Sequence, residues 1–196
     1  MNDTRPTLFV FSGLPGVGKT TLARRLASWA SACLLRIDTI EQGLRDLCAL
    51  QVGGEGYRLA YRIAHDNLCL NTNVIADCCN PVDLTRAEWR SVALSSHARH
   101  LDIEVICSDE REHRVRIAGR ESDIPNLVLP DWTAIQQREY HRWKDHRIVV
   151  DTAGATPTQS FDALVARLVE AGFAQSTSKG LLSQASRQIR QTNEER

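Results

Sequence analysis

The feature that most constrains this chain is a glycine-rich octapeptide between two short apolar segments. Residues 7–12 (TLFVFS) are rich in β-formers and end at a glycine, which predicts a buried strand. Residues 13–20 follow with the sequence GLPGVGKT, and residues 21–30 then place apolar side chains at helical spacing. A strand, a glycine loop and a helix in this order predict a loop that binds an anion at the start of the helix.

The octapeptide matches G-x-x-x-x-G-K-[ST], the phosphate-binding P-loop or Walker A motif. Its glycines let backbone N–H groups turn inward around a phosphate, Lys19 reaches the β- and γ-phosphates, and the Thr20 hydroxyl ligates Mg²⁺. The sequence therefore predicts a nucleoside triphosphate and Mg²⁺ as cofactors. The expected nucleotide-binding residues are Gly13, Leu14, Pro15, Gly16, Val17, Gly18, Lys19, Thr20 and Thr21.

Short apolar runs alternate with helical segments along the chain. The expected strands are 7–12, 33–37, 73–77, 102–107 and 147–151. This alternation is typical of βαβ units and predicts an α/β fold, with a parallel five-stranded sheet flanked by helices on both faces. Ligands of such sheets bind beyond the carboxyl ends of the strands. The P-loop, Asp38, Asp77 and the segment 109–121 should therefore converge on one edge.

The sequence predicts a single domain, 1–173, followed by a polar tail. Helices are expected at 39–50, 57–71, 81–98, 109–121, 132–143 and 161–171. The charged segment 109–121 and the loop after it, to about residue 130, are expected to form a helical lid that carries arginines. Residues 174–196 are rich in Ser, Gln and Arg, and we expect a flexible tail there.

Composition excludes several classes of protein. Of the 196 residues, 42% are hydrophobic and 24% are charged, which is typical of a globular domain. The sequence has no run of 18 apolar residues and no signal-peptide pattern, so we expect no membrane span. Six cysteines without zinc-site spacing are expected as free thiols of a cytoplasmic protein. With 24 basic and 24 acidic residues, the net charge is zero, which does not favour a nucleic-acid partner; the oligomeric state is not indicated.

Acidic residues at the ends of two expected strands indicate which branch of the P-loop proteins the chain resembles. The sequence lacks both the N-K-x-D tetrapeptide of GTPases and the long apolar strand ending in Asp-Glu of motor and AAA+ ATPases. Instead, Asp38 closes the second expected strand and Asp77 the third. With the segments RIDTIEQGLR (36–45), VIADCCNP (74–81) and RVRIAGR (114–120), the chain resembles the polynucleotide-kinase-like and zeta-toxin-like group of small P-loop kinases. Such sequences are often labelled only ATPase or kinase.

On the acceptor side, the resemblance implies a role for four residues. Asp38 would accept the proton of the substrate hydroxyl as a catalytic base. Arg45, one or two helical turns further on, would contact the substrate. Asp77 would hold Mg²⁺ or the acceptor, and Asn80 would contact the substrate or orient the same loop.

In the lid, the resemblance implies that Arg116 and Arg120 approach the transferred phosphoryl group and the nucleotide. The two are four residues apart and share a helix face, where like charges are costly unless an anion lies between them. This favours a lid that faces phosphate. The alternative is a solvated helix with i,i+4 ion pairs and with His113 at the surface.

Simpler roles stay open for other residues. Asp38 and Asp77 each suit the amino-terminal cap of the helix that follows. The glycines at 53–56 form either a linker or a loop that covers substrate, and Arg58 and Arg62 just after them are placed to meet an anionic acceptor.

Together, these features predict an ATP- and Mg²⁺-dependent kinase that phosphorylates a hydroxyl of a small molecule. Its catalytic residues would be Lys19, Asp38, Arg116 and Arg120. One alternative is a nucleic-acid 5′-hydroxyl kinase, although the chain lacks the basic balance that phosphate contacts require. Another is a nucleotide-dependent switch that hydrolyses ATP slowly, which needs no acceptor base. The sequence does not identify the acceptor.

Overall fold

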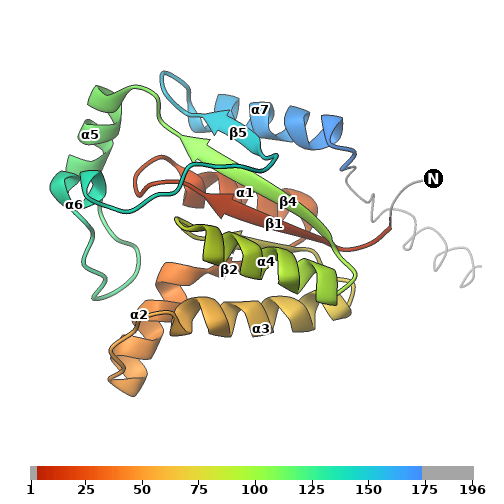
Figure 1. Ribbon diagram of the computed structural model, residues 1–196. Helices are drawn as coiled ribbons and strands as arrows, with labels where there is room; N and C mark the ends of the chain where they lie inside the picture. The colour runs from red at the N-terminus through yellow and green to blue at the C-terminus, as the bar shows by residue number, and fades with distance from the viewer. Residues whose placement is uncertain (1–3, 174–196) are drawn as a thin grey trace, which may run out of the picture.

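The structure is a computed structural model that describes residues 4–173, in which strands and helices alternate along the chain (Figure 1). The strands are β1 (Thr7–Ser12), β2 (Cys33–Arg36), β3 (Val74–Asp77), β4 (Arg99–Ile106) and β5 (Ile148–Asp151). The helices are α1 (Lys19–Ala30), α2 (Ile37–Cys48), α3 (Glu55–Cys69), α4 (Asp83–Ser95), α5 (Glu110–Ala118), α6 (Trp132–Gln136) and α7 (Pro157–Glu170). The tail expected at 174–196 lies outside the described residues.

All five strands are parallel and lie in the order β2-β3-β1-β4-β5, which confirms the predicted sheet. The central strand β1 pairs with β3 and β4, which lie far from it in the sequence. In this register Asp77 is opposite Phe11 of β1 and Arg36 of β2. The ends of three strands therefore meet beside the glycine loop, and α2, α5 and α6 gather at that same end in Figure 1.

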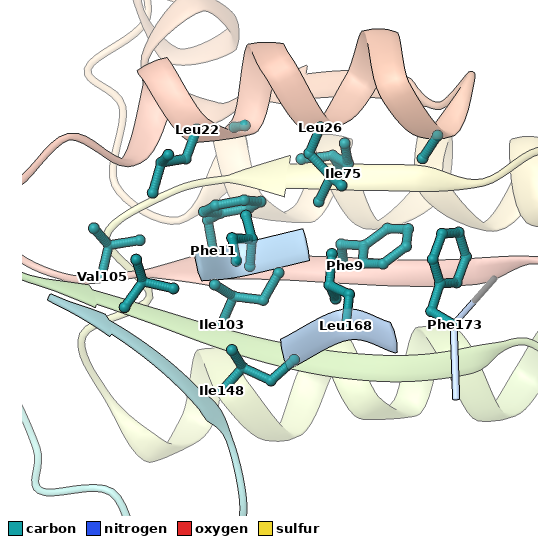
Figure 2. Packing of buried hydrophobic residues seen from close by; sticks show 14 of the residues in the cluster. Phe9, Phe11, Leu22, Leu26, Ile75, Ile103, Val105, Ile148, Leu168 and Phe173 are labelled. Atoms are coloured by element: carbon teal, nitrogen blue, oxygen red, sulfur yellow. The ribbon is translucent and has the colours of Figure 1, made fainter. Parts of the chain in front are cut away.

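Alternating side chains of β1 separate two apolar clusters. Phe9 and Phe11 face α1 and α7 and are fully buried among side chains such as Leu26 (Figure 2). Leu8 and Val10 face the other side, where α3 and α4 cover the sheet. This period of two is the geometry of a strand buried on both faces.

The segment before β5 differs from the prediction. A helix was expected over 132–143, but α6 ends at Gln136 and an irregular α6–β5 connection (residues 137–147) runs to the sheet. The backbone carbonyls of His141 and Arg142 accept hydrogen bonds from the buried Arg86, at 2.9 and 3.5 Å. The connection therefore finds its partners in a distant side chain instead of in a helical ladder.

Three other boundaries move for local reasons. Helix α2 begins at Ile37, and Arg36 occupies its N-cap position. Helix α7 begins at Pro157, before the expected 161, because Thr156 and Gln159 form a reciprocal capping box. Gly56 lies inside α3, where a Cβ atom would stand 2.2 Å from Cγ of Glu41. The glycines at 53–56 thus include one that lets α2 and α3 approach closely.

Helices long and apolar enough to cross a membrane are absent from the part of the chain that the structure describes.

Candidate active site

The loop between β1 and α1 turns through three glycines with positive φ: 136° at Gly13, 84° at Gly16 and 99° at Gly18. A Cβ atom on Gly13 would lie 2.2 Å from the carbonyl oxygen of Val105, and one on Gly16 would lie 2.4 Å from Cδ1 of Ile117 in α5. The positive φ favours glycine at all three positions, and at Gly13 a side chain would also collide with the backbone of β4.

Lys19 begins α1 and is 8% exposed. Its Nζ donates a 2.8 Å hydrogen bond to the carbonyl of Leu14, which holds the ammonium group within the turn of the loop. The loop borders a cavity of about 940 Å³. Of the expected nucleotide-binding residues, those that line it are Pro15, Gly16, Gly18, Lys19, Thr20 and Thr21; those that shape the loop without lining it are Gly13, Leu14 and Val17.

Asp77 ends β3 beneath the P-loop and also lines the cavity. Burial raises the pKa of its carboxyl, while Lys19 and a hydrogen bond from the Thr20 hydroxyl act in the opposite direction. Among the described residues, its Oδ2 has no hydrogen-bond partner, and Nε of Arg36 lies 3.9 Å from it. A buried carboxylate oxygen without a partner, beside a hydroxyl, is suited to a divalent cation.

Asp38 lies in the first turn of α2, half-buried at the edge of the cavity. Because Arg36 is the N-cap residue and no side chain caps this helix, the alternative that Asp38 serves only as the cap is wrong. A carboxylate in the first turn is favoured by the positive end of the helix. Asp38 thus shares the cavity with Lys19 and Thr20, as expected.

Asp123 of the lid joins two elements of the P-loop end, a contact that the sequence analysis missed. Arg24 of α1 and Arg36 of β2 both donate hydrogen bonds to its carboxylate, the second at 2.7 Å. These two guanidinium groups lower the pKa of Asp123 to about 2. These two ion pairs therefore connect the lid to α1 and β2 beside the cavity.

Arg116 of α5 lines the cavity and is held by three bonds. It donates to Oγ1 and to the carbonyl oxygen of Thr152 at 2.7 and 2.8 Å, and to Glu112 at 2.5 Å. The backbone N–H of Gly154 and Arg116 together lower the pKa of Glu112. The expected i,i+4 ion pair, between Glu112 and Arg116, is present, but it lies on the face of α5 that borders the cavity and not on a solvated face. Thr152, four residues before the α7 cap, carries no local sequence signal for this role.

Arg120 also lines the cavity, and its Nη1 is buried with no hydrogen-bond partner in the described chain. His113 corrects an expectation: it is buried, not at the surface. Its Nε2 lies 2.7 Å from the carbonyl oxygen of Pro15, and its ring meets Trp132 edge-on at 5.2 Å. The histidine therefore anchors the lid helix to the P-loop.

Three residues expected at the acceptor do not line the cavity. Asn80 is fully buried, and its Nδ2 donates to Oγ of Ser12 at 3.0 Å. This position supports the orienting role for Asn80 and does not support contact with substrate. Arg58 and Arg62 are exposed on α3, away from the cavity.

The far end of the cavity is built from separate segments. Helix α2 contributes Glu41, Gln42 and Arg45, which share a face with Asp38 at helical spacing. Cys79 follows β3, and the lid contributes residues 126–130. Arg138 reaches the cavity from the α6–β5 connection. The helical spacing from Asp38 was a usable signal for the α2 residues, whereas nothing local marks Arg138.

Comparisons with known proteins agree with this geometry. A family model described as an AAA domain matches residues 8–141. A search of curated proteins found no match.

Solved structures share the fold at low sequence identity. A gluconokinase from Sinorhizobium meliloti is 14% identical, with a TM-score of 0.63, over 91% of this chain and 97% of that one. A sugar kinase from Janibacter sp. is 15% identical, with a TM-score of 0.59, over 84% and 94%. An APS kinase from Mycobacterium tuberculosis, in complex with AMPPNP and APS, is 20% identical, with a TM-score of 0.57, over 85% and 98%. The predicted P-loop kinase fold is confirmed.

Proposed function

Because the chain belongs to the AAA domain family and has the fold of small P-loop kinases, we propose that it transfers the γ-phosphoryl group of ATP to a hydroxyl of a small molecule. The observation that carries this proposal is that the carboxylate of Asp38 borders the same cavity as Lys19 and Thr20. A nucleotide-dependent switch has no need of a carboxylate at that position. The neighbours that are described as a gluconokinase, a sugar kinase and an APS kinase support a small acceptor.

The P-loop end binds the triphosphate. Backbone N–H groups of the glycine loop and the start of α1 face the phosphates, and Lys19 exchanges its bond to Leu14 for the β- and γ-phosphate oxygens. Thr20 and Asp77 would hold Mg²⁺, which when bound neutralises charge on the phosphates. The unpartnered Oδ2 of Asp77 beside Thr20 fits this role.

At the other end, Asp38 orients the acceptor hydroxyl and takes its proton. As the acceptor oxygen bonds to the γ-phosphorus, the bond to the β–γ bridging oxygen breaks, and ADP leaves with that electron pair. Arg116 and Arg120 neutralise the charge that develops on the transferred group. A cavity of about 940 Å³ lies at the upper end of the usual range for ligand pockets, so nucleotide and acceptor fit together.

The Asp38→Asn variant tests the proposal. Asparagine keeps the size of the side chain but cannot accept the proton, so acceptor phosphorylation should fall by about 10²–10⁴-fold. ATP affinity should stay near that of the wild type, because Asp38 meets only the acceptor. Phosphorylated product is measured by mass spectrometry across alcohols, sugars, nucleosides and oligonucleotide 5′ ends, and ATP affinity by calorimetry.

Asp66→Asn is the matched control, since Asp66 is exposed on α3 and does not line the cavity. Lys19→Ala serves as the inactive reference. Wild-type phosphorylation in Asp38→Asn would contradict the base assignment. An absence of acceptor-stimulated ATP consumption across the panel would favour the switch, and a preference for oligonucleotide ends would favour the nucleic-acid kinase.

The lid arginines give a second test. Arg120→Ala should lower kcat by about 10²–10³-fold while changing nucleotide affinity little, because its charge is used mainly in the transition state. Arg116→Ala should lower kcat by less, since Glu112 and Thr152 already engage that guanidinium. Steady-state kinetics and nucleotide binding separate the two effects, with the exposed Arg114→Ala on the same helix as the control. Loss of affinity with kcat unchanged would assign both residues to binding.

A further inference from the structure

One face of α2 extends the cavity beyond the proposed base. Glu41, Gln42 and Arg45 follow Asp38 by three, four and seven residues, and all of them line the cavity. Seven residues correspond to about two helical turns, or about 10 Å along the axis. A molecule that extends along α2 from a hydroxyl at Asp38 therefore reaches Arg45.

A second guanidinium group, from outside α2, lines the cavity at the end where Arg45 lies. Arg138, at the start of the α6–β5 connection, lines the cavity and lies close enough to Glu41 to favour its charged form. Arg45 donates to Oε2 of Glu41 at 3.3 Å. Burial nevertheless raises the pKa of Glu41, in spite of both neighbours. One partly desolvated carboxylate thus interacts with two guanidinium groups.

The other cationic side chains that border the cavity either have bonded partners or lie at the phosphate end. Arg36 is bonded to Asp123, and Arg116 to Glu112 and Thr152. Lys19 and Arg120 belong to the phosphate end. By contrast, no hydrogen bond or ion pair found in the described chain engages the side chain of Arg138, which has only the charge of Glu41 nearby, and Arg45 has contacts only with its own helix neighbours Glu41 and Gln42.

We propose that the acceptor carries an anionic group, a carboxylate or a phosphate, bound by Arg45 and Arg138 about two helical turns from the hydroxyl that is phosphorylated. Guanidinium groups match both anions through paired N–H donors. Leu127, Leu129 and Pro130 of the lid line the same cavity, while Arg45 and Arg138 are themselves exposed to solvent at its end.

This inference rests on the proposed kinase activity, and its test uses matched acceptors. ADP release and product are measured with gluconate against glucitol, ribose 5-phosphate against ribose, and glycerol 3-phosphate against glycerol. Binding of each acceptor to the AMPPNP-loaded full chain is followed by thermal shift and calorimetry. The variants are Arg45→Gln, Arg138→Gln and the double variant. Arg142→Gln, exposed on the same connection and outside the cavity, is the control.

We expect the anionic member of at least one pair to exceed its neutral partner about tenfold or more in kcat/KM or affinity. Arg138→Gln should lower its kcat/KM about 10–100-fold through KM, the scale of one charge-assisted hydrogen bond, and leave ATP binding unchanged. The carboxylate and phosphate pairs distinguish the two anions. Equal use of neutral acceptors, equal losses for both members of a pair, a preference for oligonucleotide ends, or no anion binding across the panel would overturn the inference.

The two proposals fail in different ways. Phosphorylation of neutral acceptors that depends on Asp38 would keep the kinase and remove the anion site. Anion binding that depends on Arg45 and Arg138, without transfer to any acceptor, would keep the anion site and remove the kinase.

Discussion

The two faces of the sheet pack against their covering elements through different interactions. Under α1 and α7, Phe9 and Phe11 pack with leucines from both helices, and Phe9 meets Phe173 edge-on at 4.9 Å. On the other face, β4 turns His100, Asp102 and Glu104 toward α4 and the α6–β5 connection. The face under α1 and α7 is fixed by apolar packing, whereas the other face combines the apolar cluster around Leu8 and Val10 with buried charge along β4.

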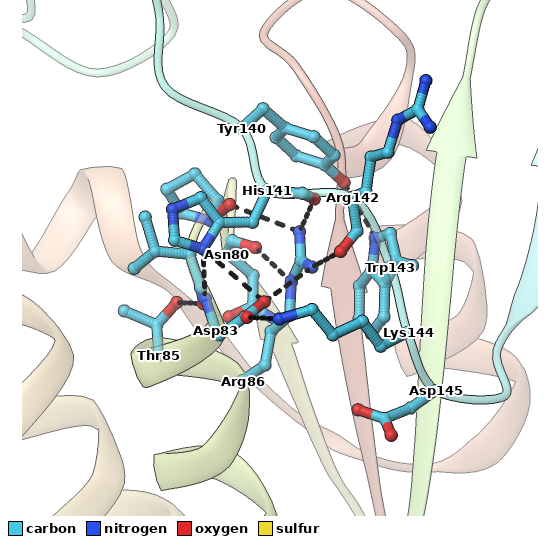
Figure 3. Close-up of polar contacts among 12 residues, drawn as sticks. Asn80, Asp83, Thr85, Arg86, Tyr140, His141, Arg142, Trp143, Lys144 and Asp145 are labelled. Carbon is cyan, nitrogen blue, oxygen red and sulfur yellow. Dashed lines mark hydrogen bonds and ion pairs between the residues drawn. The ribbon is translucent and has the colours of Figure 1, made fainter.

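Arg86 is the centre of the charged face (Figure 3). It is 2% exposed, lies 3.9 Å over the ring of Trp143, and donates to the backbone carbonyls of Asn80, Pro81, His141 and Arg142. It thereby joins the loop after β3 to the connection that carries Arg138. Asp102 and His100 on this face titrate with shifted pKa values, whereas the cluster around Phe9 and Phe11 is apolar, so the stabilities of the two faces should respond differently to pH.

The largest effect is expected on the apolar face. Phe9→Ala should lower the free energy of unfolding by about 3–5 kcal/mol, because it removes a fully buried ring and leaves a cavity. The loss should be nearly the same at pH 5 and pH 8, as no titrating group contacts the ring cluster. Urea unfolding at both pH values measures it, with Val169→Ala on the exposed side of α7 as control. A strong pH dependence would contradict the separation of the two faces.

Arg86→Met should cost less stability but act selectively on the acceptor end. Methionine keeps a stem against Trp143 while the four carbonyls lose their donor, and we expect a loss of about 2–4 kcal/mol. The KM of the acceptor should rise by a larger factor than ATP affinity falls, because Arg86 bonds directly to the connection that carries Arg138 and reaches the P-loop only through Asn80 and Ser12. Urea unfolding, acceptor kinetics and nucleotide calorimetry give the three values.

Lys144→Met, which removes an exposed ion pair to Asp83, is the control for Arg86→Met and should leave the free energy of unfolding nearly unchanged. Equal weakening of nucleotide and acceptor binding in Arg86→Met would show that the charged network supports the whole cavity.

The smallest effect concerns Asp102, whose pKa burial raises from an ordinary value of about 4 to about 6. The folded protein therefore binds this proton more tightly than the unfolded chain. Its favourable contribution is complete below about pH 4 and is lost as the pH rises through 6. Asp102→Asn stays neutral at every pH, so the variant should be about 1–2 kcal/mol more stable than the wild type at pH 8 and equal to it near pH 4.

Two neighbouring side chains, Arg90 and His100, determine how much stability the Asp102→Asn variant gains. Arg90 loses its 3.4 Å contact with Asp102 but keeps Asp145 at 2.7 Å. Burial, helped by Arg90, lowers the pKa of His100 to about 4, so its neutral ring can accept a hydrogen bond from the new amide. Chemical unfolding at pH 4, 6 and 8 measures the profile. A variant less stable than the wild type at pH 8 would show that the Arg90 contact outweighs the cost of burial.

Much of the fold was predictable because its signals are local. The strand, glycine loop and helix around Lys19 are set by residues that are neighbours in the chain, and alternating apolar runs indicated the parallel sheet. The position of Asp38 followed from the rule that ligands meet the carboxyl ends of strands. Helix ends were less accurate: the early start of α7 depends on Thr156 and Gln159, a capping pair that was present in the sequence and not used.

Other features had no local signal. His113 was expected at the surface because a charged segment surrounds it, but it bonds to Pro15, 98 positions away. The helix expected over 132–143 ends at Gln136, and in the connection that follows, Arg86, more than 50 residues upstream, binds the carbonyls of His141 and Arg142. Asn80 was expected at the substrate, but its amide turns to Ser12 beneath the loop.

By itself, the sequence determined the phosphate-binding loop, the α/β class and the carboxylate at the end of β2, since each depends on backbone geometry and spacing within a few residues. Only the tertiary structure decided which charged groups meet. The crossovers of the sheet bring together Asp123 with Arg24 and Arg36, Arg116 with Thr152, and Arg138 with the face of α2. Because a charge interacts over several ångströms with whatever the fold places beside it, its partner is a property of the topology and not of the neighbouring sequence.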